Sequence, residues 1–357
     1  MTDLGTLAGT ISSSGAAIND LGQVTGSAVT ASGVYHGFRW TRSGGMQDLG
    51  MLPGGTTSVG GAINDLGQVT GNADTATGNY HAFRWTASGG MQDLGTLGGT
   101  TSVGGAINDL GQVTGWADTA TGAHAFRWTA SAGMQDLGTL GGTTSYGDAI
   151  NDLGQVTGYA AAASGNSYAF RWTASGGMQD LGTLPGGRPS SFGNAINDLG
   201  QVTGWALTAS GEHAFRWTAS GGMQDLGTLG GMNSYAAAIN DLGQVAGYAD
   251  TASGSTHAFR WTPSGGMQDL GTLPGGTTSS GGAINDLGQV AGYAGTASGW
   301  THAFRWTASG GMQDLGTLGG TISYANTGNA INDLGQVTGS ARTASSDSAY
   351  HAFLWSP

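Results

Sequence analysis

The stretch SVGGAINDLGQVTGNADTATGNYHAFRWTASGGMQDLGTL, residues 58–97, decides the fold. Turn residues separate its short apolar and β-branched runs, which is typical of strands. The segment NDLG suits a type I turn that ends in a left-handed glycine, and ASGG suits a glycine hairpin loop. No part of the stretch has the 3.6-residue period of a helix. It therefore predicts four short antiparallel strands. The strands are expected at residues 58–63, 68–73, 81–86 and 91–97.

This stretch is one of eight copies, and the motifs Ile-Asn-Asp, Phe-x-Trp and Asp-Leu-Gly-x-Leu each occur eight times. Four strands in a repeat of about 44 residues is the blade unit of a β-propeller. A β-solenoid is the rival fold, but its coils are shorter and its strands parallel, whereas hairpin turns require antiparallel neighbours. The sequence therefore predicts an all-β fold, an eight-bladed β-propeller of four-stranded antiparallel blades. The Ile-Asn-Asp copies begin at Ile18, Ile63, Ile107, Ile150, Ile196, Ile239, Ile284 and Ile331.

The repeats form one expected domain, residues 1–357, and the small-residue segment Val-Gly-Gly-Ala-Ile is expected innermost, where eight strands crowd around the axis. Met-Gln-Asp-Leu-Gly is then outermost. The last copy ends after three strands, while residues 1–7 form an outer strand without a blade of its own. We therefore expect the N-terminal strand to complete the last blade and close the ring, which leaves no open sheet edge. The expected blades are 12–50, 57–97, 101–140, 144–184, 190–229, 233–273, 278–318, and 323–357 plus 1–7.

The composition agrees with a globular repeat protein. The chain has 71 glycines among 357 residues, yet the glycines do not recur at every third position, which excludes collagen. Its 11 Trp, 10 Tyr and 9 Phe argue against disorder. A net charge of −12, with no lysine, excludes the basic footprint of a nucleic-acid-binding protein. No apolar run is long enough for a membrane span, and the first residues lack the features of a signal peptide.

The repeated charges favour a structural role. A four-residue loop would place each arginine of Phe-Arg-Trp opposite the aspartate of Met-Gln-Asp on the neighbouring strand, where an ion pair is expected. The eighth copy has Leu354 in place of the arginine. The Asp of Ile-Asn-Asp is a preferred turn residue; a calcium site built from the eightfold acidic ring is the alternative. The expected pairs are Arg39–Asp48, Arg84–Asp93, Arg127–Asp136, Arg171–Asp180, Arg216–Asp225, Arg260–Asp269 and Arg305–Asp314.

No residue stands out as catalytic, and no cofactor or metal is predicted. Seven repeats carry a histidine before Ala-Phe or Gly-Phe, and Tyr168 replaces it once. Equivalent positions on neighbouring blades lie at least about 10 Å apart, too far for a shared zinc ion. The histidines are therefore expected to form hydrogen bonds within each blade. Glu212 is the only glutamate, and the glycine pairs lack the lysine of a phosphate-binding loop.

The eight copies differ in length in two segments, which precede Ile-Asn-Asp and Phe-x-Trp, and in this fold both segments emerge on the same rim. All aromatic residues outside Phe-x-Trp fall in or beside them. Variable loops on a fixed scaffold are typical of binding sites. The alternative is that these rings only pack between blades. The candidate ligand-binding residues are Trp116, Tyr146, Tyr159, Phe192, Trp205, Tyr235, Tyr248, Tyr293, Trp300 and Tyr324.

The motifs Ile-Asn-Asp-x-Gly-Gln-Val-x-Gly, His-Ala-Phe-x-Trp and Met-x-Asp-Leu-Gly-x-Leu resemble the HAF family of probable extracellular repeats, and the resemblance covers essentially the whole chain. It implies a secreted or surface-exposed protein and transfers no catalytic residue. The sequence thus predicts a non-enzymatic, monomeric scaffold that binds a glycan, peptide or protein ligand. The alternative is a purely structural repeat protein, recently amplified or engineered, with no specific ligand.

Overall fold

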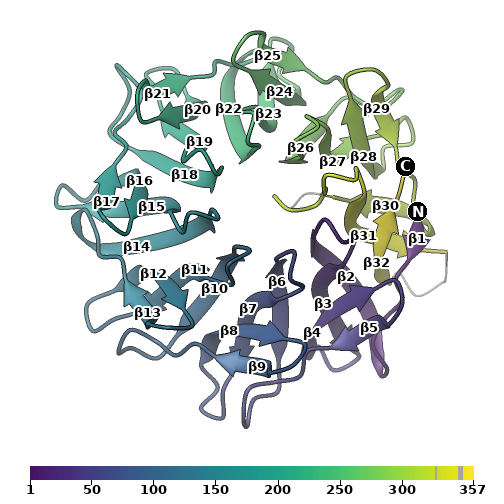
Figure 1. The fold of residues 1–357 in the computed structure, drawn as a ribbon. Coiled ribbons are helices and arrows are strands. Elements are labelled where there is room, and N and C mark those ends of the chain that lie inside the picture. Colours follow the sequence, from purple (N-terminus) through teal and green to yellow (C-terminus); the bar gives the residue numbers. More distant parts are fainter. Residues whose placement is uncertain (326–327, 345–348) are drawn as a thin grey trace.

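The computed structural model describes residues 1–325, 328–344 and 349–357 and shows eight four-stranded sheets arranged as blades of a ring (Figure 1). Every neighbouring pair of strands within a sheet is antiparallel. The predicted all-β, eight-bladed β-propeller is therefore confirmed. Each blade has an inner, a second, a third and an outer strand, counted from the central channel.

The strands occupy equivalent places in the eight blades. The inner strands are β2 (Thr10–Ile18), β6 (Ser58–Ile63), β10 (Ser102–Ile107), β14 (Gly141–Ile150), β18 (Ser191–Ile196), β22 (Gly230–Ile239), β26 (Ser279–Ile284) and β30 (Gly319–Tyr324). The second strands are β3 (Val24–Thr30), β7 (Val69–Asp74), β11 (Val113–Asp118), β15 (Val156–Ala162), β19 (Val202–Leu207), β23 (Val245–Thr251), β27 (Val290–Gly295) and β31 (Val337–Thr343). The third strands are β4 (Tyr35–Thr41), β8 (Tyr80–Thr86), β12 (Ala123–Thr129), β16 (Ser167–Thr173), β20 (Glu212–Thr218), β24 (Thr256–Thr262), β28 (Thr301–Thr307) and β32 (Tyr350–Trp355). The outer strands are β5 (Gly45–Asp48), β9 (Gly90–Asp93), β13 (Gly133–Asp136), β17 (Gly177–Asp180), β21 (Gly222–Asp225), β25 (Gly266–Asp269), β29 (Gly311–Asp314) and β1 (Thr2–Asp3).

The ring closes as the sequence predicts. The N-terminal strand β1 is the outer strand of the eighth blade, with Thr2 opposite Leu354 and Asp3 opposite Phe353 of β32. The two chain ends therefore lie side by side (Figure 1). We call the junction between the eighth and the first blade the seam.

Glycine is required where the inner strand bulges toward the second strand. The register between β6 and β7 shifts between Gly60 and Ala62, so one extra residue lies on the inner strand. Opposite this bulge, a Cβ on Gly71 would lie 1.9 Å from the carbonyl oxygen of Val59. The same close approach recurs in other blades, so part of the high glycine content is a packing requirement of the inner strands.

The core lies between blades rather than within them. Phe83 is fully buried, and its cluster also contains Trp85 of the second blade and Leu49 and Leu52 of the segment that leaves the first blade. Because each blade covers one face of the next, every apolar sheet face is buried only when the ring is complete.

A buried serine on each inner strand ties neighbouring blades together. The Ser58 hydroxyl accepts a hydrogen bond from the backbone N–H of Gly37, at 2.9 Å, and donates one to the carbonyl oxygen of Gly50, at 2.8 Å. The same pair of bonds occurs at all eight junctions, including the seam. The serines are Ser13, Ser58, Ser102, Ser145, Ser191, Ser234, Ser279 and Ser323.

Candidate functional site

The propeller has two unlike rims. The Asn-Asp-Leu-Gly turns and the hairpins between third and outer strands lie on one rim, which we call the constant rim because these turns keep one length in all repeats. The loops between second and third strands, and the crossings from one blade to the next, lie on the opposite rim, the variable rim. Any ligand therefore meets either an eightfold repeated surface or an irregular one.

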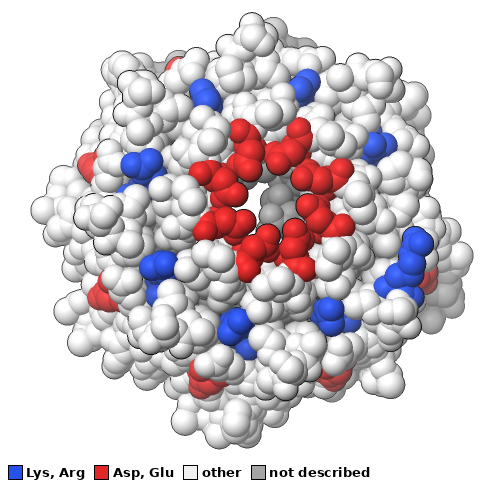
Figure 2. All heavy atoms as spheres, in the orientation of Figure 1, with Lys and Arg blue, Asp and Glu red and all other residues white. Residues whose placement is uncertain are grey.

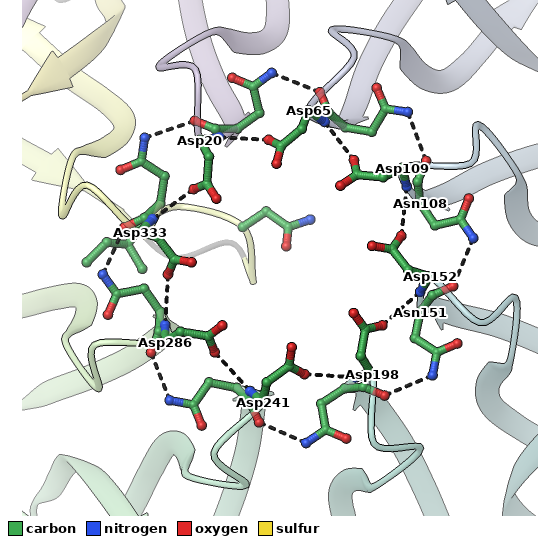
Figure 3. A pocket seen from close by; sticks show the side chains of 18 of the residues that line it. Asp20, Asp65, Asn108, Asp109, Asn151, Asp152, Asp198, Asp241, Asp286 and Asp333 are labelled. Carbon is green, nitrogen blue, oxygen red and sulfur yellow. Dashed lines mark hydrogen bonds between the residues drawn. The ribbon is translucent and has the colours of Figure 1, made fainter.

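The constant rim surrounds the channel mouth with eight carboxylates, which we call the acidic ring (Figure 2). Each carboxylate accepts a hydrogen bond from the backbone N–H of the preceding ring member, as between Asp20 N–H and Asp65 Oδ1 at 2.9 Å. The circle closes from Asp333 to Asp20, also at 2.9 Å (Figure 3). The ring consists of Asp20, Asp65, Asp109, Asp152, Asp198, Asp241, Asp286 and Asp333.

A second circle runs beside the first. The Asn19 side-chain N–H donates to the carbonyl oxygen of Asn64 at 2.8 Å, and the series ends with Asn332 donating to the carbonyl oxygen of Asn19 at 2.9 Å. The side-chain oxygen of Asn19 also accepts a hydrogen bond from the backbone N–H of Gln23 within the same turn, at 2.8 Å. The Ile-Asn-Asp motif thus links each blade to the next by hydrogen bonds, a role that its turn preference alone did not indicate.

Burial and mutual repulsion disfavour the charged form of several carboxylates in the acidic ring. Burial raises the pKa of Asp65, Asp109, Asp198 and Asp333; a backbone hydrogen bond to each of them opposes that rise, and the neighbouring carboxylates add to it. A bound cation would relieve this repulsion. Within the described part of the chain, however, no group of three or more His, Asp or Glu side chains is placed to hold a metal ion. The hydrogen-bond circles account for the positions of the aspartates, and the calcium site stays an alternative hypothesis.

The predicted arginine–aspartate pairs are wrong. The hairpin register places Arg84 opposite Gln92 and Asp93 opposite Phe83, one residue away from the expected pairing, because Thr86 pairs with Gly90 and leaves three residues in the loop. Each arginine instead lies over the tryptophan of the next blade, with guanidinium-to-ring distances of 4.7 to 5.7 Å. The pairs not formed are Arg39–Asp48, Arg84–Asp93, Arg127–Asp136, Arg171–Asp180, Arg216–Asp225, Arg260–Asp269 and Arg305–Asp314.

The outer-strand aspartates bind the histidines instead. His81 Nδ1 lies 2.9 Å from the Asp93 carboxylate, and the same contact occurs in every repeat that has a histidine. Within the eighth blade, His351 contacts Asp3 at 2.8 Å and so holds the N-terminal strand. The expected hydrogen bonding of the histidines within each blade is confirmed. Histidine and aspartate twelve residues apart, repeated six times, were the sequence signal for this pair; the seventh pair joins the two ends of the chain.

Most of the candidate ligand-binding aromatics pack against one another on the variable rim. A continuous row, which we call the aromatic arc, runs through the junctions from the third to the sixth blade with ring centroids 4.3 to 6.0 Å apart. Tyr293 and Tyr324 form a separate contact at 5.6 Å. These contacts match the packing alternative, and a binding role for these residues stays a prediction. The aromatic arc consists of Trp116, Tyr146, Tyr159, Phe192, Trp205, Tyr235 and Tyr248.

Three aromatic side chains of the variable rim are exposed. Trp300 is 45% exposed, Tyr35 48% and Tyr80 43%, and each lies in or beside the loop between a second and a third strand. Of these, the sequence singled out Trp300 as a site residue. Exposed rings of this kind are suited to contact with a ligand.

The middle of the central channel is lined mainly by glycine, alanine and isoleucine residues, and two blades add a polar side chain at one shared position. Asp148 and Asn194 occupy the position of Gly61 and project into a space of about 450 Å³. Asn194 donates a hydrogen bond to the carbonyl oxygen of Ala236 at 2.8 Å. The surrounding protein raises the pKa of Asp148 to about 7, although the open channel leaves its side chain accessible to solvent.

A cavity that the sequence reasoning missed lies on the variable rim at the seam. It has a volume of about 330 Å³, and we call it the seam pocket. The available signal was the comparison of repeats: serines stand at positions where other junctions carry aromatic rings. Three serines and three tyrosines line it: Ser14, Ser27, Ser340, Tyr35, Tyr324 and Tyr350.

Comparison with solved structures shows the fold alone. Dipeptidyl peptidase 4 of Porphyromonas gingivalis matches with a TM-score of 0.57 and 10% identity, covering 93% of this chain and 56% of that one. A lectin of Burkholderia pseudomallei matches with a TM-score of 0.48 and 12% identity, covering 85% and 98%. TolB of Acinetobacter baumannii matches with a TM-score of 0.44 and 10% identity, covering 69% of this chain, which spans 62% of TolB.

Sequence comparison adds no assignment. No protein-family model matches the chain, so the resemblance to the HAF repeats stays a prediction. The search of curated proteins found no match either. A search of the described residues for a helix long and apolar enough to cross a membrane found none.

Proposed function

We propose that the protein is a non-enzymatic binding scaffold that holds an extracellular glycan, peptide or protein ligand on its variable rim. The observation that carries the proposal is the confinement of variation to one rim. The turns of the constant rim keep one length in all repeats, whereas loop length and the additional aromatic residues vary on the other rim. Selection for ligand contacts acts on loops over a rigid framework, which is the pattern found here.

The exposed rings give the proposal its contact residues. Tyr35 and Tyr80 begin their strands and Trp300 directly precedes one, so these rings lose little conformational freedom when they meet a ligand. The aromatic arc between them stiffens the rim. The extracellular location rests on the family resemblance, and fractionation of the source cells with surface proteolysis tests it.

A glycan and peptide array tests the binding role. The full chain is compared with a triple variant, Tyr35→Ala, Tyr80→Ala and Trp300→Ala, which removes the exposed rings and leaves the interblade contacts in place. A ligand of the wild type should bind the triple variant at least about tenfold more weakly, while the melting temperature changes little.

The matched control removes equally exposed apolar side chains from the constant rim. Leu66 is 66% exposed, and Leu110 and Leu153 hold the same turn position, so a Leu66→Ala, Leu110→Ala and Leu153→Ala variant should bind like the wild type. Equal loss in both variants would refute a site on the variable rim.

A purely structural array is the second candidate, and the packing of the aromatic arc favours it. Seven rings in continuous contact stabilise the interblade junctions whether or not a ligand exists. The same arrays separate the two: no ligand among glycans and peptides, together with a large loss of stability on breaking the arc, supports the structural reading.

A further inference from the structure

We propose that the seam pocket binds a small aromatic ligand that carries a hydrogen-bonding group, of the phenol or indole class. The proposal deepens the proposed function, on which it rests for the use of the variable rim. At the equivalent position, four other junctions hold a pair of aromatic rings.

Each junction brings a residue in the middle of a second strand against one in the middle of the next inner strand. Four junctions fill this place with two aromatic rings at 5.0 to 6.0 Å. The backbone there is therefore spaced to hold rings. The four pairs are Trp116–Tyr146, Tyr159–Phe192, Trp205–Tyr235 and Tyr293–Tyr324.

The seam has the same backbone but small side chains. Ser340 and Ser14 take the two facing positions, and Ser27, the cross-strand partner of Ser14, takes the next one along the rim. The Ser12 and Ser13 hydroxyls hold the backbone in place, since they bind the carbonyl oxygens of Tyr350 and Gly5. The space that rings fill elsewhere remains as the seam pocket.

The size of the pocket suits one or two rings. An apolar cavity on the order of 150 Å³ is large enough for a benzene ring, and the seam pocket has about 330 Å³. A phenol or an indole fits this volume with space for its polar group. At the equivalent places of other junctions, the same backbone accommodates tyrosine and tryptophan rings, whose side chains resemble a phenol and an indole.

The lining offers both kinds of contact that such a ligand uses. Tyr324, Tyr35 and Tyr350 supply aromatic surface, and Tyr324 continues on its far side into the contact with Tyr293. The Arg342 guanidinium lies 5.3 Å from the Tyr350 ring and supports that wall. Among the described residues, the hydroxyls of Ser14, Ser27 and Ser340 have no hydrogen-bond partner, so they are available to a phenol O–H or an indole N–H.

Calorimetric titration of the full chain with 4-methylphenol and with indole tests the proposal. We expect saturable binding of one molecule per chain. The double variant Ser14→Tyr and Ser340→Trp rebuilds the missing rings, so it should bind both probes at least tenfold more weakly. Ser280→Tyr is the matched control, because it adds a ring at the same position of the junction between the sixth and seventh blades and should leave binding unchanged.

Three results would overturn the proposal. They are no saturable binding of either probe, equal binding by the double variant, or methyl β-glucoside binding as tightly as 4-methylphenol, which would make the pocket a sugar site. If the double variant does not fold, a crystal soaked with 4-bromophenol decides: bromine between Tyr324 and Tyr35 supports the proposal, and bromine only elsewhere refutes it. Because Tyr35 also lines the seam pocket, the array is repeated with a Tyr80→Ala and Trp300→Ala variant that leaves the pocket intact, so the two proposals can fail separately.

Discussion

The seam and the junction between the fourth and fifth blades perform the same task with different side chains. In the latter, Tyr159 meets Phe192 at 5.0 Å, and Arg171 lies 4.7 Å from the ring of Trp217. At the seam, serines replace both rings, and Leu354 stands where the arginine would be.

What the two junctions share is a set of hydrogen bonds. Ser191 and Ser13 bridge their respective blades in the same way, and the circles of the Asn and Asp turns pass through both junctions. The seam also receives the N-terminal strand, held by His351 and Asp3. The invariant bonds therefore close the ring, while the side chains on the variable rim are free to differ. A junction that is closed by such bonds can leave its ring positions vacant and form a pocket.

Deletion of residues 1–7 should have the largest effect on this comparison, because it removes the outer strand of the eighth blade, which only this blade takes from the other end of the chain. The deletion takes away two buried leucines, Leu4 and Leu7, and the bond from the Leu4 N–H to the carbonyl oxygen of Ala352 at 3.0 Å. Losing one buried leucine side chain costs about 2–5 kcal/mol, and a whole domain is stable by about 5–15 kcal/mol. We expect the truncated chain to unfold or aggregate, as measured by thermal melting with circular dichroism and by size-exclusion chromatography.

The matched control for the deletion is Thr2→Ala, which changes an exposed residue of the same strand and should melt like the parent. If the truncated chain also melted within about 2 °C of the parent, closure by the N-terminal strand would contribute nothing, and the hydrogen-bond circles alone would hold the seam.

The sequence predicts the fold because its decisive signals are local. Four strands, their turns and the missing fourth strand of the last blade can all be read from one repeat and the two chain ends. The arginine–aspartate pairing failed because a hairpin that closes one residue earlier changes every cross-strand neighbour: Asp93 faces Phe83 and joins His81 rather than Arg84. Register within a glycine-rich loop depends on backbone angles that composition does not determine, as Gly90 with φ of 66° shows.

The candidate site was only partly predictable. Repeat variation correctly indicated which positions differ, but whether two rings on neighbouring blades touch depends on how the blades pack. Trp205 and Tyr235 meet at 5.9 Å across the junction between the fifth and sixth blades, and nothing in their sequence separation indicates this contact. The seam pocket arises from residues more than 300 positions apart, Ser14 and Ser340, so it exists only in the closed ring.

The second test compares the filled junction with the vacant one directly. Phe192 lies between Tyr159 and Trp205, so Phe192→Ala should lower the free energy of unfolding by about 1–3 kcal/mol, less than for a fully buried ring because Phe192 is half-buried. Ser14→Ala changes the equivalent place at the seam and should stay within about 0.5 kcal/mol of the wild type. Urea unfolding measures both. If both variants lost the same free energy of unfolding, Ser14 would contribute as much to its junction as Phe192 does to the aromatic arc, which would contradict an unfilled position at the seam.

The smallest expected effect concerns the channel, where the fourth blade differs from its neighbours by one carboxylate. The surrounding protein raises the pKa of Asp148 to about 7, against an ordinary value of 3.8 that applies in the unfolded chain. Between these two values the folded state holds more protons than the unfolded state, so the free energy of unfolding falls as the pH rises from about 4 to about 7 and stays lowered above that. The channel admits solvent, which weakens the effect, so we expect the melting temperature to differ by less than about 2 °C.

Asp148→Asn removes this group and copies the natural side chain of Asn194 in the next blade. Its melting temperature should therefore fall less between pH 5 and pH 8 than that of the wild type, as scanning calorimetry measures. The aspartates of the acidic ring whose pKa is raised, Asp65, Asp109, Asp198 and Asp333, are the same in both proteins, so their contribution cancels in the comparison. Asn194→Asp is the reciprocal variant and should enlarge the fall, because it places a second carboxylate in the same channel. A variant Asp148→Asn with the full pH dependence of the wild type would show that the acidic ring, rather than the channel, sets the response to pH.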